Sequence, residues 1–124
     1  MDPDIQISRT RDRGITRITY RGKARFNLTT EMIREAALIG FKNRSKLLLL
    51  DISESDDPDY QVNAVKHAEQ APSLGIDTDF RIAILGKADD QRLPYFEEVA
   101  ANHGLQVKSF TDDPEAVTWL LGNR

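Results

Sequence analysis

The strongest pattern in the chain is a run of four leucines, Leu47 to Leu50, between Lys46 and Asp51. The run shows no helical stripe and is too short to span a membrane. A continuous apolar run of this length, followed by polar turn residues, is typical of a central strand covered on both faces. We therefore expect residues 46–51 to form the middle strand of a sheet and to end at Asp51.

Four further strands are predicted from alternating and β-branched positions. Residues 4–8 and 15–21 would pair as a hairpin, joined by a polar turn over residues 9–13. Two later segments, residues 80–85 and 105–110, complete the set of strands.

Four helices are predicted between and after these strands, and capping residues mark their ends. Thr29 can cap the first, Asp57–Pro58 opens the second and Pro72 ends it. The third covers residues 89–103, and Asp113–Pro114 opens the fourth. The residues expected to face the core are Ile33, Ala36, Ala37, Gly40 and Phe41, then Val62, Val65 and either Ala68 or Glu69, then Phe96, Val99 and Ala100, and last Ala116, Trp119 and Leu120.

The element order is β-β-α-β-α-β-α-β-α. Strands that alternate with helices after a hairpin predict an α/β fold with a mixed, mostly parallel sheet of about five strands and the hairpin at one edge. The 124 residues show no repeat or linker, so a single domain over residues 1–124 is expected.

Composition excludes several classes of site. The chain has no cysteine, which rules out disulfides, thiolate metal sites and cysteine nucleophiles and is compatible with a reducing compartment. No segment reaches the length of a membrane helix, and we expect a cytoplasmic protein without membrane insertion.

Charge is divided unequally along the chain. Residues 1–46 carry a net charge of +6 and residues 47–124 carry −9. The arginines of the hairpin could bind nucleic acid, but no aromatic side chains alternate with them, and edge strands commonly carry such charges. We therefore expect no nucleic-acid partner, whereas the opposite charges of the two halves could support a homodimer.

Polar residues that follow the strands define a candidate site. Parallel strands should bring Asp51, Ser53 and Lys87 to one edge of the sheet, where Lys87 could pair with Asp51 or attract an anion. The acidic segment 51–59 has no glycine at the sixth and no glutamate at the twelfth position of a calcium loop. No glycine-rich phosphate motif is present either, so no metal, cofactor or catalytic residue is predicted.

Three segments carry a resemblance to a known family. They are Lys46–Asp51 before a helix, Phe80–Gly86, and Val107–Leu120, in which a strand leads into a helix that ends in Ala-x-x-Trp-Leu. Together they resemble the STAS superfamily, in particular the bacterial domains that are similar to anti-sigma-factor antagonists and are called STAS/SEC14-like or SpoIIAA-like. The resemblance covers nearly the whole chain in element order.

The resemblance implies a regulatory or ligand-binding module rather than an enzyme. In the antagonist branch a partner kinase phosphorylates a serine just after the central strand, and the matching stretch here contains Ser53 and Ser55. The compact Asp-Ser-Ser/Thr-Gly signature of that branch is interrupted by Ile52, and no glycine follows. Asp56 and Asp57 stand in its place and would repel a phosphate.

Three functions therefore remain open. The leading hypothesis is a module that recognises a protein partner or a small ligand through Asp51, Ser53, Ser55 and Lys87. The alternative is a carrier of a lipid or another apolar small molecule, which would need an internal cavity. The third is an enzyme, which would need an acid, a base and a nucleophile near Asp51 and Lys87. The aromatic residues expected to line the carrier's cavity are Phe41, Phe80, Phe96 and Trp119.

Overall fold

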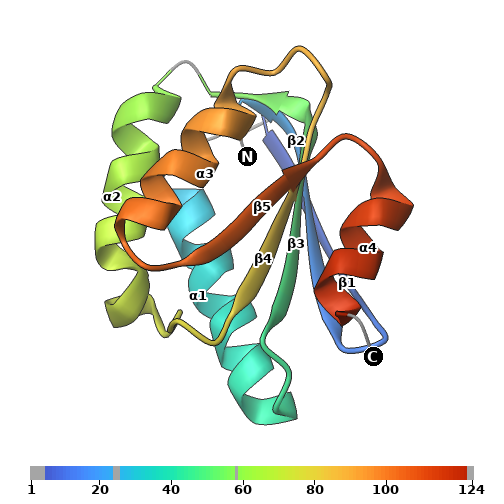
Figure 1. The fold of residues 1–124 in the computed structure, drawn as a ribbon. Helices are drawn as coiled ribbons and strands as arrows, with labels where there is room; N and C mark the ends of the chain where they lie inside the picture. Colours follow the sequence, from blue (N-terminus) through green and yellow to red (C-terminus); the bar gives the residue numbers. More distant parts are fainter. Residues whose placement is uncertain (1–4, 24–25, 58, 123–124) are drawn as a thin grey trace.

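One five-stranded sheet with helices on both faces forms the framework of the molecule (Figure 1). The computed structural model describes residues 5–23, 26–57 and 59–122. Strand β1 runs antiparallel to β2, the other neighbours are parallel, and the spatial order is β1-β2-β3-β4-β5. The predicted α/β fold class is confirmed. The elements are β1 (Ile5–Asp12), β2 (Ile15–Lys23), α1 (Phe26–Asn43), β3 (Leu47–Asp56), α2 (Tyr60–Leu74), β4 (Arg81–Leu85), α3 (Arg92–Asn102), β5 (Gln106–Phe110) and α4 (Asp113–Leu121).

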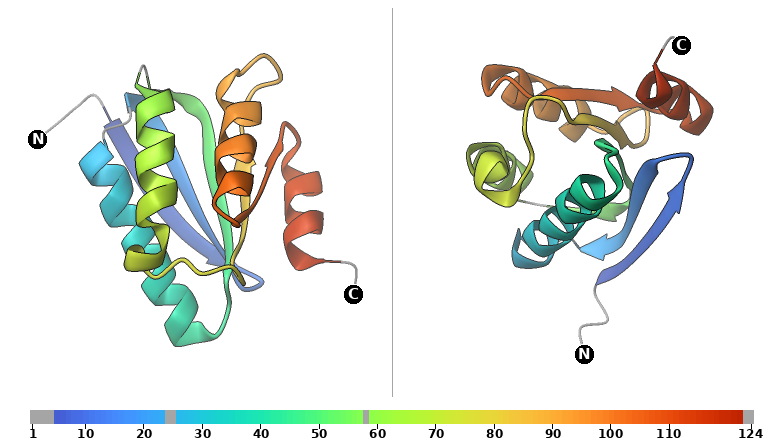
Figure 2. Two further views of the ribbon diagram at one scale, coloured as in Figure 1. Left: turned by 60° about the vertical axis from the view of Figure 1, so that its left-hand side comes forward. Right: turned by 90° about the horizontal axis from the view of Figure 1, so that it is seen from below.

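The two faces of the sheet are covered unequally. Helices α1, α2 and α3 lie on one face and α4 lies on the other (Figures 1 and 2). Leu48 belongs to the apolar cluster under the three helices, whereas Leu49 belongs to the cluster under α4, and they are 1% and 0% exposed. Strand β3 lies between β2 and β4, so the prediction of a central strand covered on both faces is confirmed.

Strand β3 continues five residues past its predicted end at Asp51. Its partner β2 also runs on, so that Arg21, Gly22 and Lys23 lie opposite Glu54, Ser55 and Asp56. Strand β4 stops earlier, with Leu85 opposite Asp51. The final part of β3 therefore has a strand on only one flank, because continued pairing with β2 outweighs the polar composition of residues 53–56.

The hairpin is also longer than predicted. Strand β1 extends to Asp12, and a two-residue turn at Arg13 and Gly14 replaces the polar turn expected over residues 9–13. Both turn residues have positive φ, +51° and +80°, which is the geometry whose twist suits a two-residue hairpin.

Three helix ends differ from the prediction. Helix α1 already includes Phe26, so Thr29 lies inside the helix rather than at its cap. Helix α2 begins at Tyr60 rather than at Pro58, which lies outside the described residues, and it continues past Pro72 to a left-handed Gly75. None of the helices in the described part of the chain has the length and apolar character that a bilayer crossing requires.

The last helix and the third begin close to their predicted positions. The side chain of Asp112, one residue before the expected Asp113, accepts the N–H of Glu115 and caps α4. Helix α3 begins at Arg92 and contains Pro94 in its first turn, where no intrahelical donor is needed.

Two residues expected in the core are exposed. Phe41 is 76% exposed because the last turns of α1 pass the lower end of the sheet (Figure 1). Val62 is 57% exposed because α2 turns its alanines, Ala68 and Ala71, toward the sheet. Small residues on that face leave space between α2 and the sheet.

Candidate functional site

The carboxyl end of the sheet holds a polar groove of about 350 Å3. Three of the four predicted site residues line it: Ser53 and Ser55 from the end of β3, and Lys87 from the loop after β4. Parallel strands place these residues at one edge although they are far apart in sequence. The other residues that line the groove are Asp56, Asp57, Tyr60, Asp89, Asp90, Gln91 and Arg92.

The fourth predicted residue, Asp51, supports the groove from behind. It does not line the groove, but its Oδ1 accepts the backbone N–H of Ser53 at 3.0 Å and the Ser53 hydroxyl at 2.7 Å. Lys87 is exposed, and the ion pair considered with Asp51 is not among those that the described residues form. Asp51 therefore fixes the position of Ser53, while the Lys87 ammonium faces solvent.

Arg92 holds the end of β3 in place of the missing neighbour strand. Its Nη2 donates to the carbonyl of Ile52 at 3.2 Å and to that of Ser55 at 2.9 Å. The same nitrogen donates to Asp90 at 2.7 Å, and Nε donates to both Asp90 oxygens. The guanidinium thus donates to two backbone carbonyls in the part of β3 that continues past the end of β4.

The ion pair between Arg92 and Asp90 is largely removed from solvent. The side chains are 11% and 14% exposed. Burial by itself would raise the pKa of Asp90, but hydrogen bonds from the Arg92 side chain and backbone N–H outweigh it and hold the pKa below its ordinary value. Asp90 is therefore charged at neutral pH and anchors Arg92.

Arg92 is not among the site residues predicted from the sequence, although the sequence contains a signal that this arginine has a specific partner. Arg92 is the first residue of α3, where the helix dipole disfavours a cation. An arginine at that position needs a compensating partner, and Asp90, two residues earlier, supplies one.

The rim of the groove is acidic. Asp56 and Asp89 are exposed, whereas Asp57 is half-buried and accepts the N–H of Asp59 at 3.1 Å and the side-chain amide of Asn63 at 3.2 Å. Within the described ranges, no three or more acidic or histidine side chains are arranged to hold a metal ion. The carboxylates therefore lie along the edge instead of converging on one point.

A largely apolar cavity of about 160 Å3, partly open to solvent, lies between the sheet and helices α1–α3. Ser55, Asp57 and Arg92 line both this cavity and the groove, so the two hollows share a wall. Of the four aromatic residues expected around a carrier's cavity, only Phe96 lines it. The other three lie elsewhere: Phe41 is exposed, Phe80 is in the core beside Gly40, and Trp119 packs on the opposite face of the sheet.

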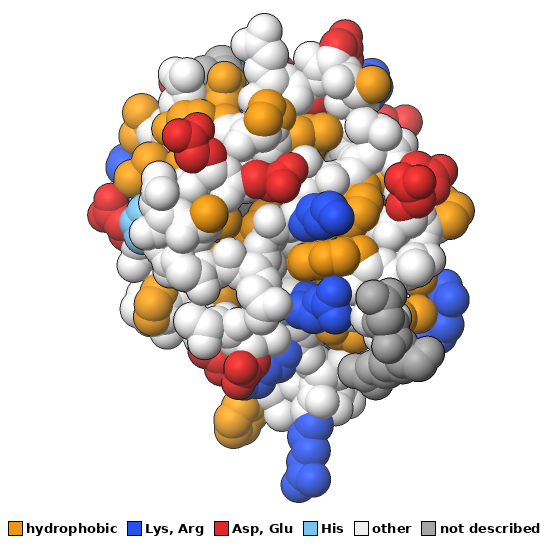
Figure 3. Space-filling view, in the orientation of Figure 1, with side chains coloured by type: hydrophobic (Ala, Val, Ile, Leu, Met, Phe, Trp, Pro, Cys, Tyr) orange, Lys and Arg blue, Asp and Glu red, His pale blue; other side chains and the backbone are white. Residues whose placement is uncertain are grey.

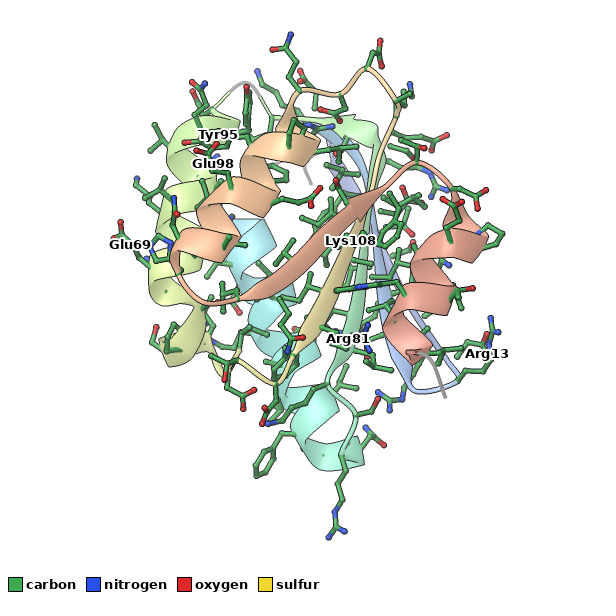
Figure 4. All side chains as sticks on the ribbon, in the orientation of Figure 1. Arg13, Glu69, Arg81, Tyr95, Glu98 and Lys108 are labelled. Carbon is green, nitrogen blue, oxygen red and sulfur yellow. The ribbon has the colours of Figure 1, made fainter. Side chains whose placement is uncertain are left out.

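A stack of cations and aromatic rings lies beside α4, away from the groove. The guanidinium of Arg81 lies 4.6 Å from the Trp119 ring centre, and the Lys108 ammonium lies 5.6 Å from that of Phe110. Basic and hydrophobic side chains alternate at the centre of Figure 3, and Figure 4 labels Arg81 and Lys108 in this region. The contact of Arg81 with Trp119 joins β4 to α4 and stabilises the packing of this helix on the sheet.

Two of the solved structures with a similar fold come from bacteria. An anti-sigma factor antagonist from Mycobacterium paratuberculosis superposes with a TM-score of 0.62 at 13% identity, covering 97% of each chain. An uncharacterized protein of the DUF3478 family from Shewanella loihica, described as having a SpoIIAA-like fold, gives 0.58 at 18% identity, covering 94% of this chain and 93% of its own. No family model and no curated protein sequence matches the chain. The likeness at these identities concerns the fold, and it confirms the fold that the sequence predicts: the chain has a SpoIIAA-like fold.

Proposed function

We propose that the chain is a non-enzymatic regulatory module that binds a protein partner at the polar groove. The observation that carries the proposal is the convergence of Ser53, Ser55 and Lys87 on one groove. Arg92 holds the backbone at the end of β3, which forms one side of this groove. Polar groups on a rigid element lose little conformational entropy on binding and therefore suit recognition. The fold shared with an anti-sigma factor antagonist supports a protein as the partner.

The charge of the rim indicates the character of the partner surface. Asp56 and Asp89 are exposed at the groove, and Glu54 lies exposed on the same strand end, where Arg21 Nε donates to it at 2.6 Å. Lysine or arginine side chains on the partner would meet these carboxylates, which would speed association and select the partner. Lys87 would then contact an acceptor at the centre of the interface.

Phosphorylation of Ser53 or Ser55 is the covalent modification that would regulate partner binding at the groove. A phosphate on Ser55 would lie beside Arg92, whose Nη1 is 3.4 Å from the hydroxyl oxygen of Ser55. The carboxylates of Asp56 and Asp57 line the same groove and oppose it. Intact-mass measurement of protein from its native cell tests this form, because each phosphate adds a defined mass to the chain.

The geometry gives less support to the other two hypotheses, an enzyme and a carrier of a lipid or another apolar small molecule. No histidine lines the groove: His67 lies in the wall of the internal cavity, and His103 lies at the end of α3, bonded to the Val99 carbonyl. The groove around Ser53 and Lys87 therefore has no imidazole that could act as the base for a nucleophile. The cavity volume of about 160 Å3 is close to that of a site for a single benzene ring, which is much smaller than a lipid with a long acyl chain.

Partner capture with a charge-neutralised groove tests the proposal. The test variant carries Asp56→Asn and Asp89→Asn. The matched control carries Glu69→Gln and Glu98→Gln, which remove the same charge from exposed positions on α2 and α3 (Figure 4). Proteins captured from native cells by the unaltered chain are identified and purified, and their affinity for all three chains is measured by calorimetry.

We expect the groove variant to bind the purified partner about tenfold more weakly, since two exposed ion pairs contribute about 1 kcal/mol or a little more in total. The control variant should bind as the unaltered chain does. Equal weakening by both variants, or no weakening by the groove variant, would remove the groove from the interface. If a small molecule binds the groove and no protein partner is captured, the proposed protein partner would be wrong, and the groove would remain the binding site.

Self-association and a cytoplasmic location stay predictions. Within one chain the hairpin arginines already pair with acids: Arg9 with Glu35, and Arg17 with Asp113 through two hydrogen bonds of 2.6 and 2.8 Å. These pairs reduce the positive charge available to a second copy. Sedimentation at two ionic strengths measures whether a homodimer forms.

A further inference from the structure

The cavity between the sheet and helices α1–α3 has a polar group without a hydrogen-bond partner among the described residues. Tyr20, from the end of β2, lines the cavity and is 3% exposed. Its hydroxyl is buried and has no hydrogen-bond partner among the residues that the structure describes. Burial raises the pKa of Tyr20, so the hydroxyl keeps its proton and is able to donate. A buried hydroxyl without a partner costs about 1–3 kcal/mol, which makes such groups rare in native proteins.

The other polar groups at this end of the cavity satisfy one another. The Arg92 guanidinium is occupied by Asp90 and by the Ile52 and Ser55 carbonyls. The Asp57 carboxylate accepts two bonds from the side-chain amide of Asn63. A ligand charge would therefore be buried without a counter-ion, and a neutral ligand is favoured.

Apart from His67, the rest of the wall is mainly apolar. Leu50, Ile52, Ile84, Phe96 and Val107 surround the space together with the small side chains of α2. A water molecule needs two to four polar partners to be well held, and here it would gain a bond from Tyr20 and face mostly hydrocarbon. An organic molecule with one oxygen fits this wall better than water does.

The volume limits the size of that molecule. An apolar cavity of about 150 Å3 holds benzene, and this cavity measures about 160 Å3. We propose that the cavity is a binding site for a neutral one-ring compound with a single hydroxyl or carbonyl oxygen, which accepts the hydrogen bond of Tyr20. This site adjoins the partner-binding groove, with which it shares Ser55, Asp57 and Arg92, but it does not rest on the function proposed for the groove.

A thermodynamic cycle with phenol and benzene as probes tests the site. Both compounds are titrated into the full chain and into Tyr20→Phe, with methyl and amide NMR shifts as the readout. The ratio of phenol to benzene affinity in each protein cancels the cost of dehydrating the phenol oxygen. Tyr95→Phe is the matched control, because the Tyr95 hydroxyl donates to the Gln61 carbonyl on the surface at 3.2 Å, between α3 and α2.

We expect both probes to bind the unaltered chain and to shift signals of the cavity wall. Tyr20→Phe should reduce the phenol-to-benzene affinity ratio about fivefold, which corresponds to one neutral hydrogen bond. Tyr95→Phe should leave the ratio unchanged. Failure of both probes to bind, shifts that lie outside the cavity wall, or an unchanged ratio in Tyr20→Phe would each overturn the proposal.

A cavity-filling variant gives an independent check. Ala68 is buried in the wall, and Ala68→Leu should abolish binding of both probes while circular dichroism shows a folded chain. If that variant does not fold, Ala64→Leu fills the same space from a half-buried position on α2. Undiminished binding in the folded filled variant would show that the probes bind elsewhere, and the proposal would fall.

Discussion

Replacing Arg92 with methionine tests whether this side chain holds the end of β3. Methionine keeps an unbranched chain of similar reach and removes the guanidinium. The change removes the Arg92 donor of the Ser55 carbonyl at 2.9 Å and that of the Ile52 carbonyl at 3.2 Å, which keeps a bond from the Ser55 hydroxyl at 3.0 Å. It also leaves the carboxylate of Asp90, which is 14% exposed, without its cation. The variant therefore loses three charge-assisted contacts at one place.

The magnitude follows from the burial of the pair. Removing one partner of a buried ion pair costs about 3–5 kcal/mol. Water reaches the remaining exposed part of Asp90, so we expect the lower end of this range, about 3 kcal/mol. For a chain of this length the loss lowers Tm by about 10 °C. Urea unfolding followed by Trp119 fluorescence measures the free energy, and hydrogen exchange should show faster exchange at residues 52–56.

Two further variants make the prediction specific. Adding Asp90→Asn to Arg92→Met removes the unpaired charge and should restore about 1–2 kcal/mol. Arg34→Met breaks an exposed ion pair with Glu31 on α1 and should cost less than about 0.5 kcal/mol. A cost below about 1 kcal/mol for Arg92→Met, with exchange at residues 52–56 unchanged, would show that β3 keeps its shape without Arg92.

Three other predictions address the core, the groove and the response to acid. Leu49→Asp should unfold the chain, because a charge at this fully buried position has no partner, whereas Leu38→Asp at a 52% exposed position should keep the circular dichroism of the folded protein. Ser53→Ala should remain folded and lower stability by about 1 kcal/mol in urea titrations while weakening partner binding, and loss of the fold would make this serine a structural residue. Hydrogen bonds from Arg17 hold the pKa of Asp113 below its ordinary value, so the stability from this pair is present at neutral pH and is lost as the pH falls below about 4. Asp113→Asn should flatten the acid side of the pH–stability curve, and an unchanged acid limb would contradict this assignment.

The central strand and the layers around it follow from the sequence. Four leucines in a row, followed by turn residues, are typical of a strand with apolar cover on both faces, and Leu48 and Leu49 belong to the two opposite clusters. Helix α4 behaves in the same way, since Ala116 and Leu120 are buried at the spacing that predicted them. These features depend on side chains close together in sequence, so a local pattern is sufficient.

The extent of β3 could not be predicted because it depends on distant partners. Residues 53–56 are polar and resemble a loop in isolation. They form a strand because β2 continues beside them and Arg92 donates to their free flank. The groove residues Ser53 and Lys87 meet for a related reason, since parallel pairing brings two segments to one edge.

The internal cavity is likewise a product of tertiary structure. The pattern of α2 placed both Val62 and Ala68 toward the core, but the helix turns Ala68 and Ala71 inward and leaves Val62 exposed. Hydrophobic periodicity shows that a face is buried, and it does not show how closely the face approaches the sheet. The sequence by itself determined the order of the elements and the two-sided burial of β3, because these depend on the local period of apolar residues. The groove, the role of Arg92 and the space beside Tyr20 were decided only when separate segments packed together, because each depends on distances between residues that no local pattern contains.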